Sequence, residues 1–227
     1  MTIIYDKIAI IGVGLIGASI ALAARRAGLA ASVTGCEIDS GKAGEIEKLG
    51  LVDHVTTDAV AAVQDADLVV MAVPVGALGP LAAQIVPAMK PGAVLTDTGS
   101  TKRSVLRDVD PHISGDIHWI PSHPLAGTEH SGPAAGFAEL FDGRYWLVLP
   151  REVVSLLPLI EPDAHLDGAI NPPALHEDLD GFGHAPAEEE QLRLAGFDRR
   201  QLLNVAHVQQ LVDLLDGRVR HLRRVQL

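Results

Sequence analysis

A glycine-rich stretch near the amino terminus constrains the fold of this chain more than any other feature. Residues 12–17 read Gly-Val-Gly-Leu-Ile-Gly, a G-x-G-x-x-G pattern, between the short apolar run 7–11 and the alanine-rich segment 15–27. The apolar run is typical of a buried strand, and the alanine-rich segment predicts a helix that ends at Gly28. A strand, a glycine turn and a helix in this order predict a phosphate-binding turn in a parallel sheet.

Each part of this turn has its own role in holding a dinucleotide. Gly12 permits the tight turn, Gly14 lets the backbone approach a pyrophosphate, and Gly17 lets the helix pack closely on the strand. The first turn of the helix, with Leu15 and Ile16, offers free N–H groups and the positive end of the helix dipole. We therefore expect all five residues to bind the cofactor.

A carboxylate follows at the position where such a turn would place the adenosine ribose. Glu37 ends the predicted second strand, 20 residues after Gly17, and would accept hydrogen bonds from the ribose hydroxyls. Its charge disfavours the 2′-phosphate of NADP, so we expect NAD, although Lys42 nearby could soften this preference. The alternative is that Glu37 only caps a solvent-facing strand end. A later predicted strand ends at Val73 and is followed by Pro74, and both residues would line the nicotinamide side of the same sheet.

Short apolar runs alternate with helical patterns through the first 150 residues. The expected strands are residues 7–11, 32–37, 53–56, 67–73, 93–98, 118–120 and 145–149, and the expected helices are residues 15–27, 41–49, 58–64, 76–89 and 100–107. Such alternation is typical of βαβ units with right-handed crossovers. We therefore predict an α/β fold for residues 1–150, a doubly wound, Rossmann-like, mostly parallel sheet that forms a nucleotide-binding domain.

The composition changes after residue 150. Residues 151–187 contain five prolines and predict a loop-rich or poorly ordered segment. Residues 188–227 predict a helical tail, because apolar residues recur there at spacings of three and four from Leu202 to Leu222. This apolar stripe would pack either on the sheet domain or on its own copy in a homodimer.

Charge and composition argue against several classes of protein. The chain has 29 acidic and 18 basic residues, a net charge of −11, which disfavours a nucleic-acid partner. The sequence shows neither a targeting signal nor an apolar run of about 18 residues, so we expect a cytoplasmic protein without a membrane span. Cys36 is the only cysteine and the ten histidines lack metal-site spacing, so we expect neither a disulfide nor a metal.

Two polar segments follow predicted strands and would lie at the same edge of the sheet as the glycine turn. Residues 97–102 read Asp-Thr-Gly-Ser-Thr-Lys, and residues 122–132 begin with Ser-His-Pro-Leu-Ala-Gly. His123 could accept a proton from a hydroxyl while a hydride leaves the same carbon, and Ser100 could orient the imidazole or bind that hydroxyl. The alternatives are that His123 is only a turn residue and that Ser100 caps the next helix. Asp97 would mark the point where a buried strand meets solvent.

These segments together resemble the prephenate and arogenate dehydrogenases of tyrosine biosynthesis. The matching motifs are residues 12–19 (GVGLIGAS), 72–74 (AVP), 97–102 (DTGSTK), 122–132 (SHPLAGTEHSG) and 141–149 (FDGRYWLVL). The resemblance covers about residues 5–150 and implies that His123 is the catalytic histidine and Ser100 the serine that partners it. It also implies NAD-dependent oxidative decarboxylation of a small-molecule substrate, prephenate or arogenate, to 4-hydroxyphenylpyruvate or tyrosine.

The resemblance does not extend over the last third of the chain. Members of this family continue into a helical domain that makes the dimer and contributes to the substrate pocket, and residues 151–227 do not align with it. One alternative is therefore an NAD-binding protein without turnover, whose substrate pocket is incomplete. Another is a dehydrogenase of small hydroxy or imino acids with the same nucleotide fold, against which the segment 123–127 argues.

Overall fold

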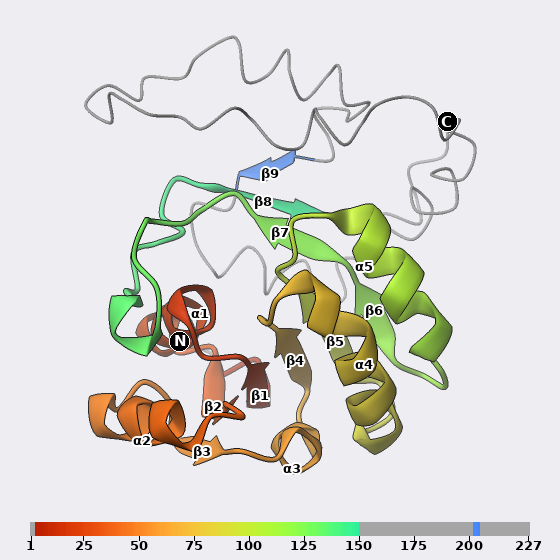
Figure 1. Ribbon diagram of the computed structural model, residues 1–227, viewed down its shortest axis with the longest axis horizontal. Helices are drawn as coiled ribbons and strands as arrows, with labels where there is room; N and C mark the ends of the chain where they lie inside the picture. The colour runs from red at the N-terminus through yellow and green to blue at the C-terminus, as the bar shows by residue number, and fades with distance from the viewer. Residues whose placement is uncertain (1–2, 150–201, 205–227) are drawn as a thin grey trace, which may run out of the picture.

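Strands and helices alternate along the chain up to β6, as the sequence pattern predicts (Figure 1). The computed structural model describes residues 3–149 and 202–204. The strands are β1 (Tyr5–Ile11), β2 (Ala30–Cys36), β3 (His54–Thr56), β4 (Leu68–Met71), β5 (Val94–Asp97), β6 (His118–Ile120), β7 (Ser122–Pro124), β8 (Tyr145–Val148) and β9 (Leu202–Asn204). The helices are α1 (Leu15–Ala27), α2 (Ser40–Leu49), α3 (Ala59–Val63), α4 (Val75–Ile85) and α5 (Lys102–Val109), with 3₁₀ turns at Val86–Ala88, Asp110–His112 and Pro133–Ala135.

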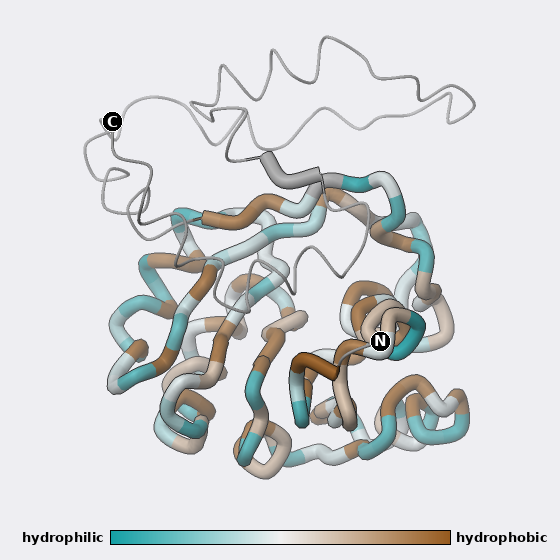
Figure 2. The backbone as a smooth tube through the Cα atoms, turned by 180° about the vertical axis from the view of Figure 1, so that it is seen from behind, coloured by the Kyte–Doolittle hydropathy of each residue, from teal (hydrophilic) through white to brown (hydrophobic). Residues whose placement is uncertain are grey.

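Strands β1 to β6 form one parallel sheet in the order β3-β2-β1-β4-β5-β6, with helices on both faces. Successive residues of β1 face opposite sides: Ile8 and Ile10 pack with α1 and α2, whereas Ala9 and Ile11 pack with α3, α4 and α5. Figure 2 shows hydrophobic stretches along strands of this sheet, between more polar surface segments. The predicted doubly wound, Rossmann-like sheet is therefore confirmed.

The order of the strands reverses between β1 and β4. From β1 the sheet extends to β2 and β3 on one side and to β4, β5 and β6 on the other. Ile11, at the end of β1, is paired with both Cys36 and Met71. In open α/β sheets the crevice beyond the strand ends at this reversal is the usual ligand site.

The helix expected over residues 76–89 is shorter in the structure. Helix α4 ends at Ile85, and a 3₁₀ turn that contains Pro87 follows it. Pro87 has no N–H to continue the i→i−4 ladder, which favours an end at this point, although Pro80 is accommodated within α4 itself.

A second, antiparallel sheet lies beyond β6 and corrects the expectation for residues 145–149. This run does form strand β8, but β8 pairs with β7 and β9 rather than closing the parallel sheet. Strand β7 begins two residues after the end of β6, with Pro121 between them, and Ser122 of β7 pairs with Val148. Strand β7 was not predicted, because three residues that end in a proline carry little strand signal.

Strand β9 corrects part of the expected helical tail. Leu202–Asn204 pairs antiparallel with β8, so these residues are extended rather than helical. Pairing satisfies the second edge of β8, and a short apolar run fits a strand as well as a helix. The whole segment 151–187 lies outside the described residues, as does the rest of the tail 188–227 with its apolar stripe.

Among residues 3–149 and 202–204, no helix is long and apolar enough to cross a membrane.

Candidate active site

The glycine turn after β1 has geometry that only glycine fits at two positions. Gly12 has a φ of +90°, and a Cβ on it would lie 2.6 Å from the carbonyl oxygen of Ala72. A Cβ on Gly17 would lie 2.1 Å from the carbonyl oxygen of Gly12. The turn is therefore packed against the end of β4 on one side and against its own helix on the other.

The space outside this turn suits an anionic group. A Cβ on Gly14 would meet nothing within 4 Å, so the backbone there is open to a ligand. Gly14 is the N-cap of α1, no side chain caps this helix, and its first turn has no acidic residue. Helix α1 begins its hydrogen-bond ladder with the N–H of Ala18, which donates to the Gly14 carbonyl at 2.9 Å. The N–H groups of Leu15, Ile16 and Gly17 precede it and have no partner within the helix. These groups fit the pyrophosphate of a dinucleotide.

The carboxylate of Glu37 lies directly after β2, as the spacing predicts. Glu37 is half-buried, and its own N–H donates to Thr56 of β3 at 3.1 Å. Its Oε1 accepts the N–H of Asp39 at 3.3 Å. Asp39 caps α2, and hydrogen bonds from the N–H groups of Lys42 and Gly41 lower its pKa. Two carboxylates therefore stand at this end of β2.

Val73 and Pro74 lie where the sequence places them, between β4 and α4. The Cγ1 of Val73 would be 2.9 Å from a Cβ on Gly12, so this side chain lies against the glycine turn. Pro74 is exposed and is the N-cap of α4. The loops after β1 and β4 thus meet at the reversal of strand order, where a cofactor would lie between them.

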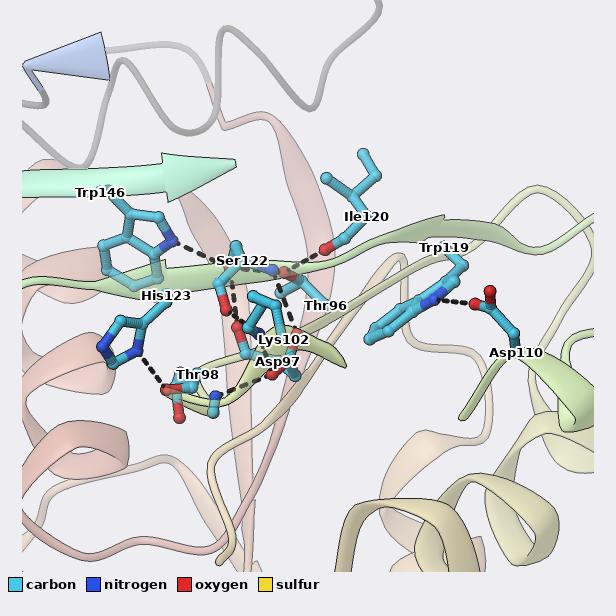
Figure 3. Close-up of polar contacts among 11 residues, drawn as sticks. Thr96, Asp97, Thr98, Lys102, Asp110, Trp119, Ile120, Ser122, His123 and Trp146 are labelled. Carbon is cyan, nitrogen blue, oxygen red and sulfur yellow. Dashed lines mark hydrogen bonds and ion pairs between the residues drawn. The ribbon is translucent and has the colours of Figure 1, made fainter. Parts of the chain in front are cut away.

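His123 lies on β7, and its ring is held by the loop after β5. Its Nδ1 lies 2.8 Å from the carbonyl oxygen of Thr98 (Figure 3). The N–H of Thr98 donates in turn to the carbonyl of Met71, the last residue of β4, at 3.2 Å. One residue therefore connects the imidazole to the edge of the cofactor crevice.

The partner of this ring determines its protonation. A carbonyl oxygen only accepts, so Nδ1 carries the proton and Nε2 of the neutral ring has a free lone pair. Burial lowers the pKa of His123, which the Thr98 carbonyl and Asp97 partly oppose and the charge of Lys102 reinforces. The imidazole is therefore neutral near pH 7, the form that accepts a proton.

Ser100 does not take either of the two structural roles considered for it. Its side chain is exposed, and the ring of His123 bonds to Thr98 instead. The N-cap of α5 is Thr101, which itself makes no side-chain cap. Ser100 therefore lies on the open side of the loop, two residues from the carbonyl that holds the ring.

A buried ion pair that sequence reasoning missed lies behind His123. Asp97 is fully buried at the end of β5, which corrects the expectation that it meets solvent there. Its carboxylate accepts an ammonium hydrogen bond from Lys102, whose side chain is 13% exposed. Burial lowers the pKa of Lys102, against the opposing effect of Asp97. The only sequence signal was a lysine five residues after an aspartate, within a segment already singled out.

The two sheets are joined by a buried polar network around Ser122. Its hydroxyl donates to the Asp97 carbonyl at 2.7 Å and accepts from Nε1 of Trp146 at 2.9 Å. The hydroxyl of Thr96 lies 2.9 Å from that of Ser122 and donates to the Ile120 carbonyl at 2.7 Å. Strands β5 to β8 therefore meet at the residue that precedes His123.

In the part of the chain that the structure describes, no group of three or more His, Cys, Asp or Glu side chains could hold a metal ion.

The fold and the glycine turn define the chain's described part as a dinucleotide-binding α/β domain. Comparison with known families narrows this class. Residues 20–155 match the family described as "Prephenate dehydrogenase, nucleotide-binding domain", which is more than half of the chain, and the chain belongs to that family.

Individual proteins similar to this chain carry names that are consistent with this family. A cyclohexadienyl dehydrogenase of Zymomonas mobilis is 42% identical over 147 residues, which are 65% of this chain and 50% of that protein. A prephenate dehydrogenase of Lactococcus lactis is 35% identical over 161 residues, covering 68% of this chain and 44% of that protein. The chain thus spans about half the length of these curated relatives.

A solved structure supports the fold. The prephenate dehydrogenase of A. aeolicus, in complex with hydroxyphenyl propionate and NAD+, superposes with a TM-score of 0.59 at 20% identity. The match covers 94% of this chain and 83% of that one.

Proposed function

We propose that this chain carries the cofactor site and the catalytic histidine of an NAD-dependent prephenate or arogenate dehydrogenase. The observation that carries the proposal is the His123 ring, held by Thr98 at the edge of the crevice between β1 and β4. The family match and the relatives' names support the reaction class. The substrate is a ring with a hydroxyl and a carboxylate, and the reaction is oxidative decarboxylation.

His123 is the residue that assists departure of the hydride. Its Nε2 accepts a hydrogen bond from the ring hydroxyl and stabilises the positive charge that develops on the carbon bearing it. NAD, when bound, supplies the hydride acceptor. As carbon dioxide leaves, the electron pair of the broken bond enters the ring, which becomes aromatic.

Ser100 is assigned to the substrate rather than to the imidazole. Thr98 already holds the ring of His123, and the Ser100 side chain is exposed on the same loop. Its hydroxyl is free to bond the substrate hydroxyl that His123 accepts from. S100A should lower kcat/KM about tenfold, the effect of one hydrogen bond of about 1.4 kcal/mol. T101A, which alters the exposed neighbouring hydroxyl, should not.

The preference for NAD over NADP rests on the end of β2. Glu37 would bond the ribose hydroxyls, and Asp39 adds a second negative charge within two residues. The free N–H groups of α1 and the open space at Gly14 suit the pyrophosphate of either cofactor, so the two carboxylates make the distinction.

The test is formation of NADH, measured by absorbance at 340 nm with purified protein, NAD and prephenate, then arogenate. H123N should lower kcat/KM by about 10²- to 10⁴-fold, the usual contribution of an acid–base residue. Calorimetry should give the same NAD affinity for both proteins. Turnover that H123N leaves unchanged would overturn the assignment of His123.

A second candidate is NAD binding without turnover. The observation that favours it is that the chain spans about half the length of its curated relatives. NAD binding in calorimetry, with no NADH formed from either substrate, would support this candidate. Turnover with either substrate would exclude it.

A further inference from the structure

The backbone of Ser122 is bound at both of its polar groups by one ion pair. Asp97 Oδ1 accepts the Ser122 N–H at 3.1 Å, and the Lys102 ammonium donates to the Ser122 carbonyl. The residue that precedes His123 is therefore fixed on both sides by side chains from β5 and α5 (Figure 3).

The same carboxylate also fixes the loop that holds the imidazole. Asp97 Oδ2 accepts the N–H of Gly99 at 2.7 Å. Thr98 lies between Asp97 and Gly99, and its carbonyl accepts from His123. The ion pair thus constrains both the backbone that carries the ring and the carbonyl that orients it.

We propose that the Asp97–Lys102 ion pair positions His123, so that Lys102 and Asp97 are positioning residues for the reaction. This inference rests on the proposed function. Lys102 does not contact the imidazole in the described contacts, and it acts through the Ser122 carbonyl and through Asp97.

Because both side chains are largely buried, neither charge of the Asp97–Lys102 pair can be removed without affecting the other. The Asp97 side chain is fully buried and that of Lys102 is 13% exposed, so removal of one partner leaves an uncompensated charge in a low-dielectric site. Seen from His123, the two charges oppose each other, since Lys102 lowers the pKa of the ring and Asp97 raises it. Among the described residues, these are the charged groups that act on His123.

The chain offers a matched control at the opposite edge of the sheet. Lys90 and Asp67 form another lysine–aspartate pair at 2.5 Å, and Asp67 precedes β4 rather than following a strand. K90M therefore removes a lysine from an ion pair at the amino end of the strands, away from His123.

The test compares K102M, K102R and K90M with the unaltered 227-residue chain. Histidine-ring NMR, with the His123 signal assigned by its loss in H123N, reports the tautomer and the pKa. K102M should mix the two tautomers, raise the pKa of His123 because a nearby positive charge is gone, and lower kcat/KM about 100-fold with unchanged NAD affinity. K102R should recover part of the lost kcat/KM, and K90M should change none of these quantities.

A double variant keeps the test decisive if K102M does not fold. D97N/K102M leaves no unpaired buried charge and should fold. The pKa of His123 in this double variant should stay near that of the unaltered chain. Its ring should nevertheless occupy both tautomers, and its kcat/KM should be about 100-fold lower than that of the unaltered chain. A single Nδ1–H tautomer and full kcat/KM in either variant would overturn the proposal. Absence of turnover in the unaltered chain would refute the proposed function, whereas the NMR readout would still decide the positioning role.

Discussion

The Nδ1 of His123 donates to the carbonyl oxygen of Thr98 across 2.8 Å, and this contact joins a loop of the parallel sheet to a strand of the antiparallel sheet. Thr98 follows the parallel strand β5, while His123 lies on the antiparallel strand β7. The contact leaves Nε2 of the neutral ring as the acceptor, and the proposed reaction would therefore depend on the protonation state of this ring.

The pH dependence of the reaction should follow His123. The proposed reaction needs the neutral ring, so kcat/KM should fall as the pH drops through the pKa of His123. Burial lowers this pKa below its ordinary value of 6.5, so the rate should be on its plateau at pH 7. A series of initial rates from pH 4.5 to 8 checks this. An acidic limb with its midpoint at 6.5 or above would contradict the burial argument.

A methyl group at Gly17 should disrupt the cofactor turn. In G17A the new Cβ would meet the Gly12 carbonyl at 2.1 Å, so the helix or the turn must shift. We expect the free energy of unfolding to fall by about 1–3 kcal/mol and the NAD affinity to fall at least about tenfold, because the α1 N–H groups move. Urea unfolding and calorimetry measure the two effects.

The control for this substitution lies on the next helix. Gly44 is inside α2, where a Cβ would meet nothing within 4 Å. G44A should therefore stabilise the protein by about 0.5–1 kcal/mol, the helical preference of alanine over glycine, with NAD affinity unchanged. Equal behaviour of G17A and G44A would mean that the close packing of the turn is unimportant.

Removing the charge of Glu37 should change cofactor choice. E37Q keeps the size of the side chain but weakens its bonds to the ribose, so the affinity for NAD should fall about tenfold. The affinity for NADP should fall less or rise, because one of two negative charges is gone. Calorimetry with both cofactors gives the ratio. E45Q, at an exposed carboxylate of α2, controls for net charge and should leave the ratio as it was.

The buried hydroxyl of Ser122 should contribute more to the free energy of unfolding than the hydroxyl of a surface serine does. S122A leaves the buried N–H of Trp146 without its acceptor and removes the bond to the Asp97 carbonyl, a cost of about 1–3 kcal/mol. S122A/W146F removes both partners, so its cost should be less than the sum of the two single costs. Urea unfolding of the three variants checks this, and strict additivity would show that the indole bond contributes nothing.

The local sequence pattern determined most of the secondary-structure elements of this protein. The sequence predicted the turn at residues 12–17, the helix that follows it and the alternation of strands with helices. This was possible because glycine, alanine and β-branched residues have backbone preferences that act over a few positions. The positions of Glu37 and Val73 after their strands followed from the same reasoning, since a parallel sheet brings all carboxyl strand ends to one edge.

Only the tertiary structure decided what surrounds His123. The partner of its ring is a backbone carbonyl, which has no residue-type signal, and the buried Asp97–Lys102 pair is bonded to the backbone of Ser122, far along the chain on β7. Strands β7 to β9 form a separate sheet through pairings between residues far apart in sequence, which no local pattern encodes. Local preferences therefore determined the elements, and long-range pairing determined which polar groups meet.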